Sequence, residues 1–227
     1  MIGIIGAMHL ETEAIRQEMT DAVTETISGS DYVRGMLWGI PAVVATCGPG
    51  KVFAAVCAQT MALRYRVDRV INVGVGGTLS PDLHIGDVAI ATSTVQHDFD
   101  TSALGDPVGL VARINVTYFA CDAALVQSAV DAASALGISH RTGVVASGDR
   151  FVADRQVKEA ITTHFGAIAC EMEGGAIGHV CYLNQLPYLV LRAISDEADG
   201  GAPTDFTSFA RSSAAQTVRL LHAMLAQ

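Results

Sequence analysis

The chain has 227 residues, of which half are apolar and 16% are charged, and its formal net charge is −9. This length accommodates one substantial α/β domain or two small ones, and the high apolar content indicates extensive burial within a protomer together with apolar surface covered by a partner subunit. The negative charge argues against partners such as nucleic acid or an anionic membrane, because both require clustered Lys and Arg, so we expect a small-molecule ligand.

The five cysteines and the N-terminal segment both indicate a soluble cytoplasmic protein. The cysteine count is odd and no C-x-x-C pair occurs, which is typical of reduced core thiols in a reducing compartment. The first residues carry no basic stretch and include a carboxylate at Glu11, so we do not expect a secretory signal. The longest apolar stretches are of strand length, too short to span a membrane.

The first half of the chain alternates between strand and helix patterns. Residues 2–5 form an apolar run that ends at a glycine, and helical spacing follows over residues 10–15. We expect a hairpin over 31–46, a helix over 51–66, a strand over 69–73 that enters a glycine-rich loop at 74–77, and a strand over 87–95. Residues 98–120 read as a long irregular loop, whose length favours a role in function or in subunit contact.

The second half continues the alternation. We expect helices over 122–136, 154–165, 174–184 and from 206 onward, and strands over 141–146, 167–170 and 187–194. Asp154 is a plausible N-cap. No linker or internal repeat interrupts the pattern. Alternating strands and helices predict an α/β fold with a mixed or mostly parallel sheet and helices on both of its faces.

Carboxylates and glycines follow several of these predicted strands, at the edge where ligands gather in α/β sheets. Each one alone has an ordinary structural interpretation: a solvated helix face for Glu11, and an N-cap or an ion pair with Arg192 for Asp196. Residues 74–77 and 48–51 match neither a dinucleotide-binding fingerprint nor a Walker loop. His97, Asp98 and Asp100 lack a fourth ligand at suitable spacing, so a structural or interface role is favoured, and we expect neither a metal nor a cofactor.

Taken together, six segments closely resemble the 5′-methylthioadenosine/S-adenosylhomocysteine nucleosidases. They appear in that family's order over nearly the whole chain: Gly6-Ala7-Met8 with Glu11, Gly50-Lys51-Val52, Asn72 to Gly77, Ser147-Gly148-Asp149-x-Phe151, Glu171-Met172-Glu173, and Arg192-Ala193-Ile194-Ser195-Asp196-x-Ala198-Asp199. The resemblance implies one nucleosidase domain over residues 1–227, with a mixed, partly barrelled sheet flanked by helices. It also implies a homodimer in which the 98–120 loop lies near the partner's active site.

The same resemblance implies a role for each matched residue. Asp196 is similar to the general acid at the purine N7, Glu11 to the base that activates water, and Glu173 to the carboxylate that holds the ribose hydroxyls. The substrate-binding positions that it implies are Phe151 and Val152 at adenine, Met172 under the sugar, Gly77 in the ligand-facing loop, Ser195 beside Asp196, and Met8, Pro49 and Phe206 at the 5′-thio group. Arg192 either positions the water or forms a structural ion pair.

The chemistry of N-glycosidic bond cleavage explains why three separate carboxylates are useful. Departure of adenine leaves an oxocarbenium-like sugar, which requires an acid at the base, a base at the water and negative charge near the ribose. For Asp196 to donate a proton, burial should favour its protonated form. The family's pattern is broken at Val75, where a small polar residue is common, and at Leu104, where an aromatic is common, so we expect the 5′ pocket to differ in shape from that of the family.

Several alternatives to this hydrolase stay open from the sequence. One is a hydrolase of aminofutalosine or another adenosine-type nucleoside, built on the same carboxylates. Another is a phosphate-dependent phosphorylase, which is disfavoured because no Arg or Lys lies between Gly6 and Glu11 to hold the dianion. A third is a nucleotide-binding module without catalysis.

Overall fold

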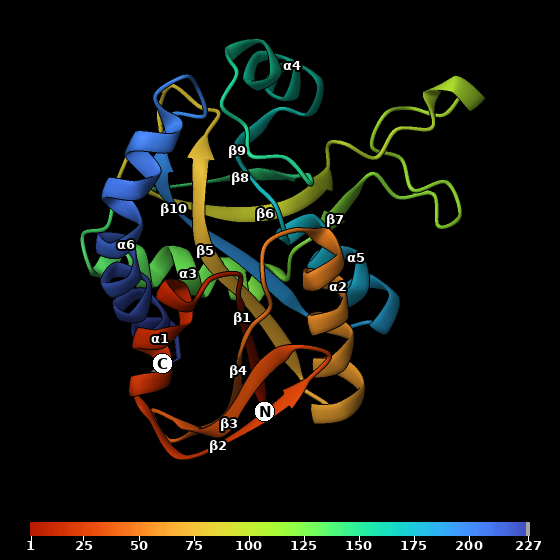
Figure 1. The fold of residues 1–227 in the computed structure, drawn as a ribbon. Coiled ribbons are helices and arrows are strands. Elements are labelled where there is room, and N and C mark those ends of the chain that lie inside the picture. The colour runs from red at the N-terminus through yellow and green to blue at the C-terminus, as the bar shows by residue number, and fades with distance from the viewer. Residues whose placement is uncertain (226–227) are drawn as a thin grey trace.

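A ten-stranded mixed sheet forms the centre of the molecule, as seen in a computed structural model that describes residues 1–225 without the side chains of residues 203–208 and 210–212 (Figure 1). The strands are β1 (Ile2–Gly6), β2 (Met19–Ile27), β3 (Ser30–Leu37), β4 (Ile40–Thr46), β5 (Arg69–Thr78), β6 (Val88–Gln96), β7 (Tyr118–Ala120), β8 (His140–Ser147), β9 (Ala167–Glu171) and β10 (Tyr188–Asp196). The helices are α1 (His9–Gln17), α2 (Lys51–Thr60), α3 (Ala123–Ala135), α4 (Arg155–Phe165), α5 (Gly174–Asn184) and α6 (Ala202–Leu225), with a π turn η1 (Met61–Tyr65) and a 3₁₀ turn η2 (Ser102–Leu104).

Five of the strands close into a barrel. The order β10-β6-β8-β9-β5 is closed by a direct pairing of β10 with β5, and β1, β4, β3 and β2 extend the sheet from β5. Parallel neighbours β1, β5 and β10 carry their carboxyl ends to one rim of the barrel. The end of β9 meets the end of β5 there through the antiparallel pair Gly77 and Cys170. Loops that are far apart in sequence therefore converge at this rim.

The core follows the apolar runs of the sequence. Every residue of β1 and of β10 is buried, and both strands are central in the sheet, where apolar side chains are covered on both faces. Helices α2 and α5 pack together on one side of the barrel, and α1 and α3 pack against α6 on the other (Figure 1). Burying each Leu or Ile side chain contributes roughly 1.5–3 kcal/mol, which is why these runs determine the layout.

Most elements expected from the sequence are confirmed. The predicted hairpin is β3 and β4, joined by Trp38 and Gly39 with φ of 50° and 80°, the left-handed pair that a tight two-residue turn requires. The predicted N-cap Asp154 accepts hydrogen bonds from the amides of Gln156 and Val157 at 2.8 and 3.2 Å. The predicted irregular loop 98–120 contains only the short elements η2 and β7.

Three expectations about the elements were wrong. Strand β2 was missed because it lies at the edge of the sheet with most of its side chains exposed, so it carries no strong apolar pattern. Residues 74–77 are not a loop but the continuation of β5, because β10 and β9 supply ladder partners up to Thr78. Helix α6 begins at Ala202, four residues before the position expected.

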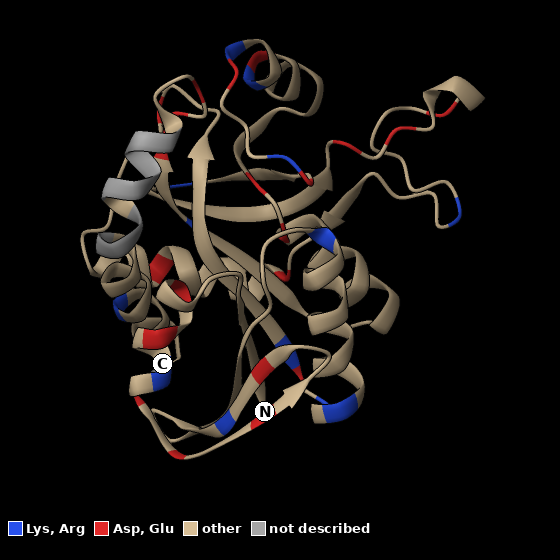
Figure 2. Ribbon diagram, in the orientation of Figure 1, with Lys and Arg blue, Asp and Glu red and all other residues tan. Residues whose placement is uncertain are grey.

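The charged residues and the cysteines are distributed as the composition led us to expect. Lys and Arg are scattered among Asp and Glu over the described ribbon (Figure 2). All five cysteines are free and buried. Within residues 1–225, none of the helices combines the length and the apolar content that crossing a membrane would need.

Candidate active site

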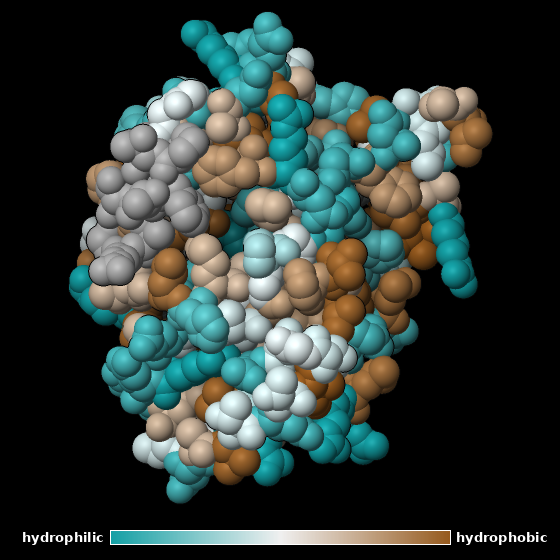
Figure 3. All heavy atoms as spheres, viewed as in Figure 1, coloured by the Kyte–Doolittle hydropathy of each residue, from teal (hydrophilic) through white to brown (hydrophobic). Residues whose placement is uncertain are grey.

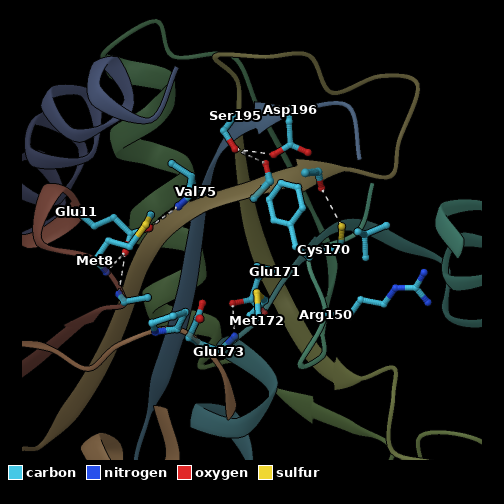
Figure 4. A pocket seen from close by; sticks show the side chains of 16 residues that line it. Met8, Glu11, Val75, Arg150, Cys170, Glu171, Met172, Glu173, Ser195 and Asp196 are labelled. Atoms are coloured by element: carbon cyan, nitrogen blue, oxygen red, sulfur yellow. Dashed lines mark hydrogen bonds between the residues drawn. The ribbon is translucent and has the colours of Figure 1, made fainter. Parts of the chain in front are cut away.

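A cavity of about 220 Å³ opens at the rim where the strand ends converge. It is lined by residues from six separate segments of the chain: Ala7, Met8, Glu11, Pro49, Val75, Gly76, Gly77, Arg150, Phe151, Val152, Cys170, Glu171, Met172, Glu173, Ser195 and Asp196. Figure 4 shows Glu11, Glu173 and Asp196 on three different sides of this space. The three carboxylates that the sequence singled out therefore face one volume the size of a small molecule.

Glu11 is held by backbone amides from the segment after β1 and from β5. It is the third residue of α1, from where its Oε2 accepts hydrogen bonds from the amides of Ala7 and Met8 at 2.7 and 2.9 Å. Its Oε1 accepts a third from the amide of Val75 at 3.1 Å. Burial raises the pKa of Glu11, while the Arg192 charge and the three amides oppose the rise. Glu11 is thus a fixed carboxylate with more basic strength than an exposed glutamate.

Glu173 lies at the start of α5 and shares its surroundings with other charges. Its Oε1 accepts a hydrogen bond from the amide of Gly50 at 2.9 Å, and its Oε2 lies 3.5 Å from the Arg192 guanidinium. Burial raises the pKa of Glu173 to about 7, and the nearby Glu171 carboxylate adds to the rise. Arg192 and the Gly50 amide act in the opposite direction. The ionised form of Glu173 therefore depends on these two partners.

Arg192 and Glu171 form a buried ion pair beside Glu173. Arg192 is 1% exposed and does not line the cavity; its guanidinium donates to Glu171, to Asn72 Oδ1 at 2.5 Å and to the Leu191 carbonyl at 3.0 Å. Glu171 also accepts from the Ser147 hydroxyl and from the amides of Glu173 and Gly174. Such a pair persists in a core because most of its polar atoms are hydrogen-bonded; among the described residues, Arg192 Nε has no hydrogen-bond partner.

Asp196 occupies the opposite side of the cavity, at the end of β10. It is 2% exposed, its Oδ2 accepts a hydrogen bond from the Ser195 hydroxyl at 2.8 Å and its Oδ1 accepts one from the Ala198 amide at 2.9 Å. Neighbouring Cys170 belongs to the same wall, and burial raises the pKa of its thiol to about 12, with the Asp196 and Glu171 charges adding to the effect. The thiol is therefore a packing group, not a nucleophile.

The structure places most, but not all, of the expected site residues at the cavity. Those that line it are Met8, Glu11, Pro49, Gly77, Phe151, Val152, Met172, Glu173, Ser195 and Asp196. The side chain of Phe206 lies outside the described part of the chain. Glu171, Arg150 and Cys170 line the cavity without having been given a role. Glu171 could have been found from its position directly after an apolar strand, although its partners lie in distant segments.

In the cluster of His97, Asp98 and Asp100, protein contacts explain the two aspartates. Asp98 accepts hydrogen bonds from Lys51 Nζ at 2.6 Å and from the Asp149 amide at 2.8 Å, so both of its oxygens are engaged. Asp100 Oδ1 accepts from the Ser102 amide at 2.8 Å. These contacts support the structural interpretation of the two carboxylates.

Comparisons with known proteins decide the family. The model of the phosphorylase superfamily matches residues 1–226. A 5′-methylthioadenosine/S-adenosylhomocysteine nucleosidase from Shewanella loihica is 38% identical over 210 residues, which make up 92% of this chain and 91% of that protein. The chain belongs to the 5′-methylthioadenosine/S-adenosylhomocysteine nucleosidase family. The family expected from the sequence is thereby confirmed.

Two solved structures extend the comparison to the fold. A nucleosidase of this family from Neisseria meningitidis, in complex with methylthio-immucillin-A, has a TM-score of 0.95 and 34% identity, with 99% of this chain and 97% of that chain covered. A futalosine hydrolase from Helicobacter pylori also has a TM-score of 0.95 and 34% identity, covering 99% and 96% of the two chains. The predicted α/β fold with a partly barrelled sheet is confirmed.

In this member of the nucleosidase family, two glycines of β5 make room for carboxylates. A Cβ added at Gly74 would lie 2.7 Å from Glu11 Oε1, and one added at Gly77 would lie 2.6 Å from Asp196 Oδ1. Neither glycine has a positive φ. These two positions therefore require glycine because there is no room for a side chain, not because the backbone needs glycine's conformational freedom. This explains why glycines occur inside a strand.

We expect Gly77→Ala to lower the rate of substrate turnover by about 100-fold, because a displacement of catalytic groups by about 1 Å can cost that much. The added methyl group would press on both Asp196 Oδ1 and Ala198 Cβ, which lies 2.9 Å from it. The measurement is kcat for adenine release alongside the thermal unfolding midpoint. Gly200→Ala is the matched control, because an added Cβ there meets nothing within 4 Å. Equal losses in the two variants would contradict the assignment.

Proposed function

We propose that this protein hydrolyses the N-glycosidic bond of 5′-methylthioadenosine and S-adenosylhomocysteine, releasing adenine and the 5′-thio-substituted ribose. The observation that carries the proposal is the convergence of Glu11, Glu173 and Asp196 on one cavity. The Shewanella loihica relative and the Neisseria meningitidis structure support the substrate class, since both are named as nucleosidases for these two compounds. Residues 1–227 act as one nucleosidase domain, in line with the family match over residues 1–226.

Asp196 is the general acid in this proposal. Protonation or hydrogen bonding at the purine N7 withdraws electrons from the base, so that adenine leaves as a neutral group instead of an anion. The Ser195 hydroxyl and the Ala198 amide fix the carboxyl group at the cavity wall and leave it little rotational freedom. Phe151, which is 44% exposed at the cavity, stacks on the base, and the backbone of Val152 reads its edge.

Glu11 is the base that activates the attacking water. The three amides that hold it fix the carboxylate at one position, and burial increases its affinity for a proton. A water that binds this carboxylate from the cavity is oriented towards the anomeric carbon of a sugar lying between Glu11 and Glu173. As the carbon–nitrogen bond lengthens, the water loses a proton to Glu11 and attacks C1′.

Glu173 holds the ribose hydroxyls, with Met172 packed beneath the sugar. The carboxylates of Glu11 and Glu173, near a ring that develops positive charge, stabilise the transition state more than the neutral ground state. Arg192 neutralises Glu171 and orients Glu173 from behind the wall, which favours the ion-pair interpretation of this arginine. Met8 and Pro49 give the 5′-thio group an apolar surface, to which Phe206 contributes.

A phosphorylase reaction fits the site less well. The amides of Ala7, Met8 and Val75, which would otherwise be available to an anion, already donate to the Glu11 carboxylate. Among the described residues that line the cavity, Arg150 is the only basic one. A phosphate dianion would have to approach the buried Glu11 carboxylate, and Arg192, the cation that acts on Glu11, is already engaged with Glu171 and Glu173. A neutral water meets no such repulsion.

Hydrolysis of futalosine-type nucleosides is the second candidate. The similarity to the Helicobacter pylori futalosine hydrolase, at a TM-score of 0.95, favours it specifically. Such a substrate carries a different group at the 5′ position, so the discrimination depends on the walls around Met8, Pro49 and Val75.

We also infer that the protein acts as a homodimer in the cytoplasm. Helix α2 exposes 73% of Val52 and 53% of Phe53, and Tyr182 and Leu183 of α5 are exposed beside it, so that hydrophobic surface gathers over these two helices (Figure 3). The segment between β6 and β7 projects from the body of the protomer, where a partner would cover it near its own site (Figure 1). Five buried, free thiols are typical of a reducing compartment.

Purified protein is expected to release adenine from 5′-methylthioadenosine and S-adenosylhomocysteine in buffer without phosphate. The measurement is adenine formed with time, followed by chromatography, for both substrates and for aminofutalosine. Added phosphate should change neither the rate nor the products. A kcat/KM that is much higher for aminofutalosine would reassign the substrate, and a ribose 1-phosphate product would reassign the reaction.

A further inference from the structure

A cycle of three charged residues lies beside the cavity and joins three loops. Lys51 Nζ donates to Asp98 Oδ1 at 2.6 Å, the Asp149 amide donates to Asp98 Oδ2 at 2.8 Å, and the Lys51 amide donates to Asp149 Oδ1 at 2.7 Å. The three residues follow β4, β6 and β8, respectively. Each residue contacts the other two, so no one of these loops can shift without the others.

On one side, this cycle is connected to Glu173, which faces the sugar in the proposed function. Gly50, directly before Lys51, is the N-cap of α2 with a φ of 98°, and its amide donates to Glu173 Oε1 at 2.9 Å. An added Cβ at Gly50 would lie 3.0 Å from Asp149 Oδ1, which shows how closely the two loops approach. The contacts of Lys51 with Asp149 and Asp98 therefore set the direction of the Gly50 amide.

On its other side, the cycle is connected to the segment that faces the nucleobase in the proposed function. Asp149 directly precedes Arg150, Phe151 and Val152, all of which line the cavity. Its amide is held by Asp98 and its carboxylate by Lys51, so the first residue of this segment is fixed at two points. A side chain such as Phe151, which is only partly covered by protein, depends on such a fixed start for its position.

Asp98 itself does not line the cavity. Burial alone would raise the pKa of Asp98, but the hydrogen bonds from Lys51 and Asp149, together with the charges of Lys51 and His97, lower it. The pair with Lys51 is better shielded, with 17% and 30% of the two side chains exposed, than the pairs Arg141–Asp82 and Arg155–Glu159. Both oxygens are used within the cycle, which leaves Asp98 no direct task in the reaction.

We infer that Asp98 and Lys51 are positioning residues for glycoside cleavage: they hold the Gly50 amide against Glu173 and the 149–152 segment against the nucleobase. This inference rests on the proposed function, since it assigns Glu173 to the sugar and Phe151 to the base. Loss of the cycle would loosen both sides of the substrate at once, without removing any group that touches it.

The consequence for pH dependence follows from the groups that face Glu173. These are Glu171 from β9, Arg192 from β10, Glu11 from α1, and the Cys47 thiol and the Gly50 amide from the segment before α2. The Gly50 amide lowers the pKa of Glu173, so its loss raises that pKa above about 7. Since the ionised carboxylate holds the ribose, activity would then decline at a higher pH as the medium is acidified.

The test compares Asp98→Asn and Lys51→Met with Lys51→Arg, which keeps a cation opposite Asp98. Asp82→Asn is the matched control, because it breaks the exposed ion pair with Arg141 at the start of β8, away from the rim. For adenine release from 5′-methylthioadenosine, we expect Asp98→Asn and Lys51→Met to raise KM about tenfold, the size expected for one charge-assisted hydrogen bond. Both should move the acid limb of kcat/KM to higher pH, whereas Lys51→Arg and Asp82→Asn should leave the limb in place.

Amide hydrogen exchange separates this inference from the proposed function, because it needs no turnover. Asp98→Asn should speed exchange in both segments 48–53 and 148–152, and Asp82→Asn in neither. Faster exchange at both segments would support the cycle even if the wild type released no adenine, an outcome that would overturn only the proposed function. Unchanged exchange, or a KM and acid limb like those of the wild type in an active Asp98→Asn protein, would overturn the positioning role.

Discussion

Asp196→Asn is expected to lower kcat for adenine release by roughly 10²–10⁴-fold, about 3–5 kcal/mol of transition-state stabilisation. Asparagine has the same shape as aspartate, and it can preserve both neighbouring contacts. Its carbonyl oxygen can accept a hydrogen bond from the Ala198 amide, and its NH₂ group can donate one to the Ser195 hydroxyl. That hydroxyl then changes from donor to acceptor. What asparagine lacks is an acidic proton for the purine N7.

The measurement is the initial rate of adenine formation over a range of substrate concentrations, together with calorimetric titration of 5′-methylthioadenosine into the variant. We expect binding within a few-fold of the wild type and an unchanged unfolding midpoint. Ser195→Ala is the matched control, because it removes one contact to the carboxyl group and leaves the acid in place, so its loss should be much smaller. Retention of more than about a tenth of kcat by Asp196→Asn would exclude general acid catalysis from this residue.

The sequence predicted the barrel's central strands because they are buried along their whole length. In β1 and β10 every position is covered, so β1 and the first half of β10 are continuous apolar runs whose interpretation is simple. Strand β2, at the sheet edge, shows the limit of this approach. Its residues are mostly exposed, and what makes it a strand is pairing with β3, which no local pattern reveals.

The glycines of β5 were misread for a different reason. Glycine usually marks a turn, and residues 74–77 were therefore assigned to a loop. In the structure, two of these glycines are strand residues whose missing side chains admit the carboxylates of Glu11 and Asp196. The signal was present in the sequence, but its meaning depends on which distant side chains cross the strand.

The candidate site was predictable at the strand ends and not beyond them. Glu11 and Glu173 follow β1 and β9, and Asp196 ends β10; the topology of an α/β sheet alone brings such positions to one rim. Their separate roles came from the family resemblance. The network behind them, in which Arg192 joins Asn72 to Glu171, requires the pairing of β10 with β5 and could not be read from any one segment.

Glu11→Gln is the second variant from which we expect a very large loss, again roughly 10²–10⁴-fold in kcat, because glutamine cannot take the proton of the attacking water. In contrast to Asp196→Asn, it also disturbs the local structure. Glutamine has one acceptor oxygen for amides that approach both oxygens of Glu11. With that oxygen towards Ala7 and Met8, its NH₂ group faces the Val75 amide, and a buried donor left without a partner costs about 1–3 kcal/mol of stability.

These two effects can be separated by comparing kcat with KM and with stability. A variant that only loosened the loop at Ala7 and Met8 would bind substrate weakly and would reach the wild-type kcat at saturation. Loss of the base instead lowers the rate at every substrate concentration, saturation included. Ala7→Gly is a matched control, since it keeps the amide that donates a hydrogen bond to Glu11 and adds backbone freedom to the same loop. If Glu11→Gln turned over at the wild-type rate at saturation, Glu11 would not be the base and another group would have to activate the water. Glu171 and Glu173, two other described carboxylates of the cavity, are poor replacements because both are already engaged with Arg192.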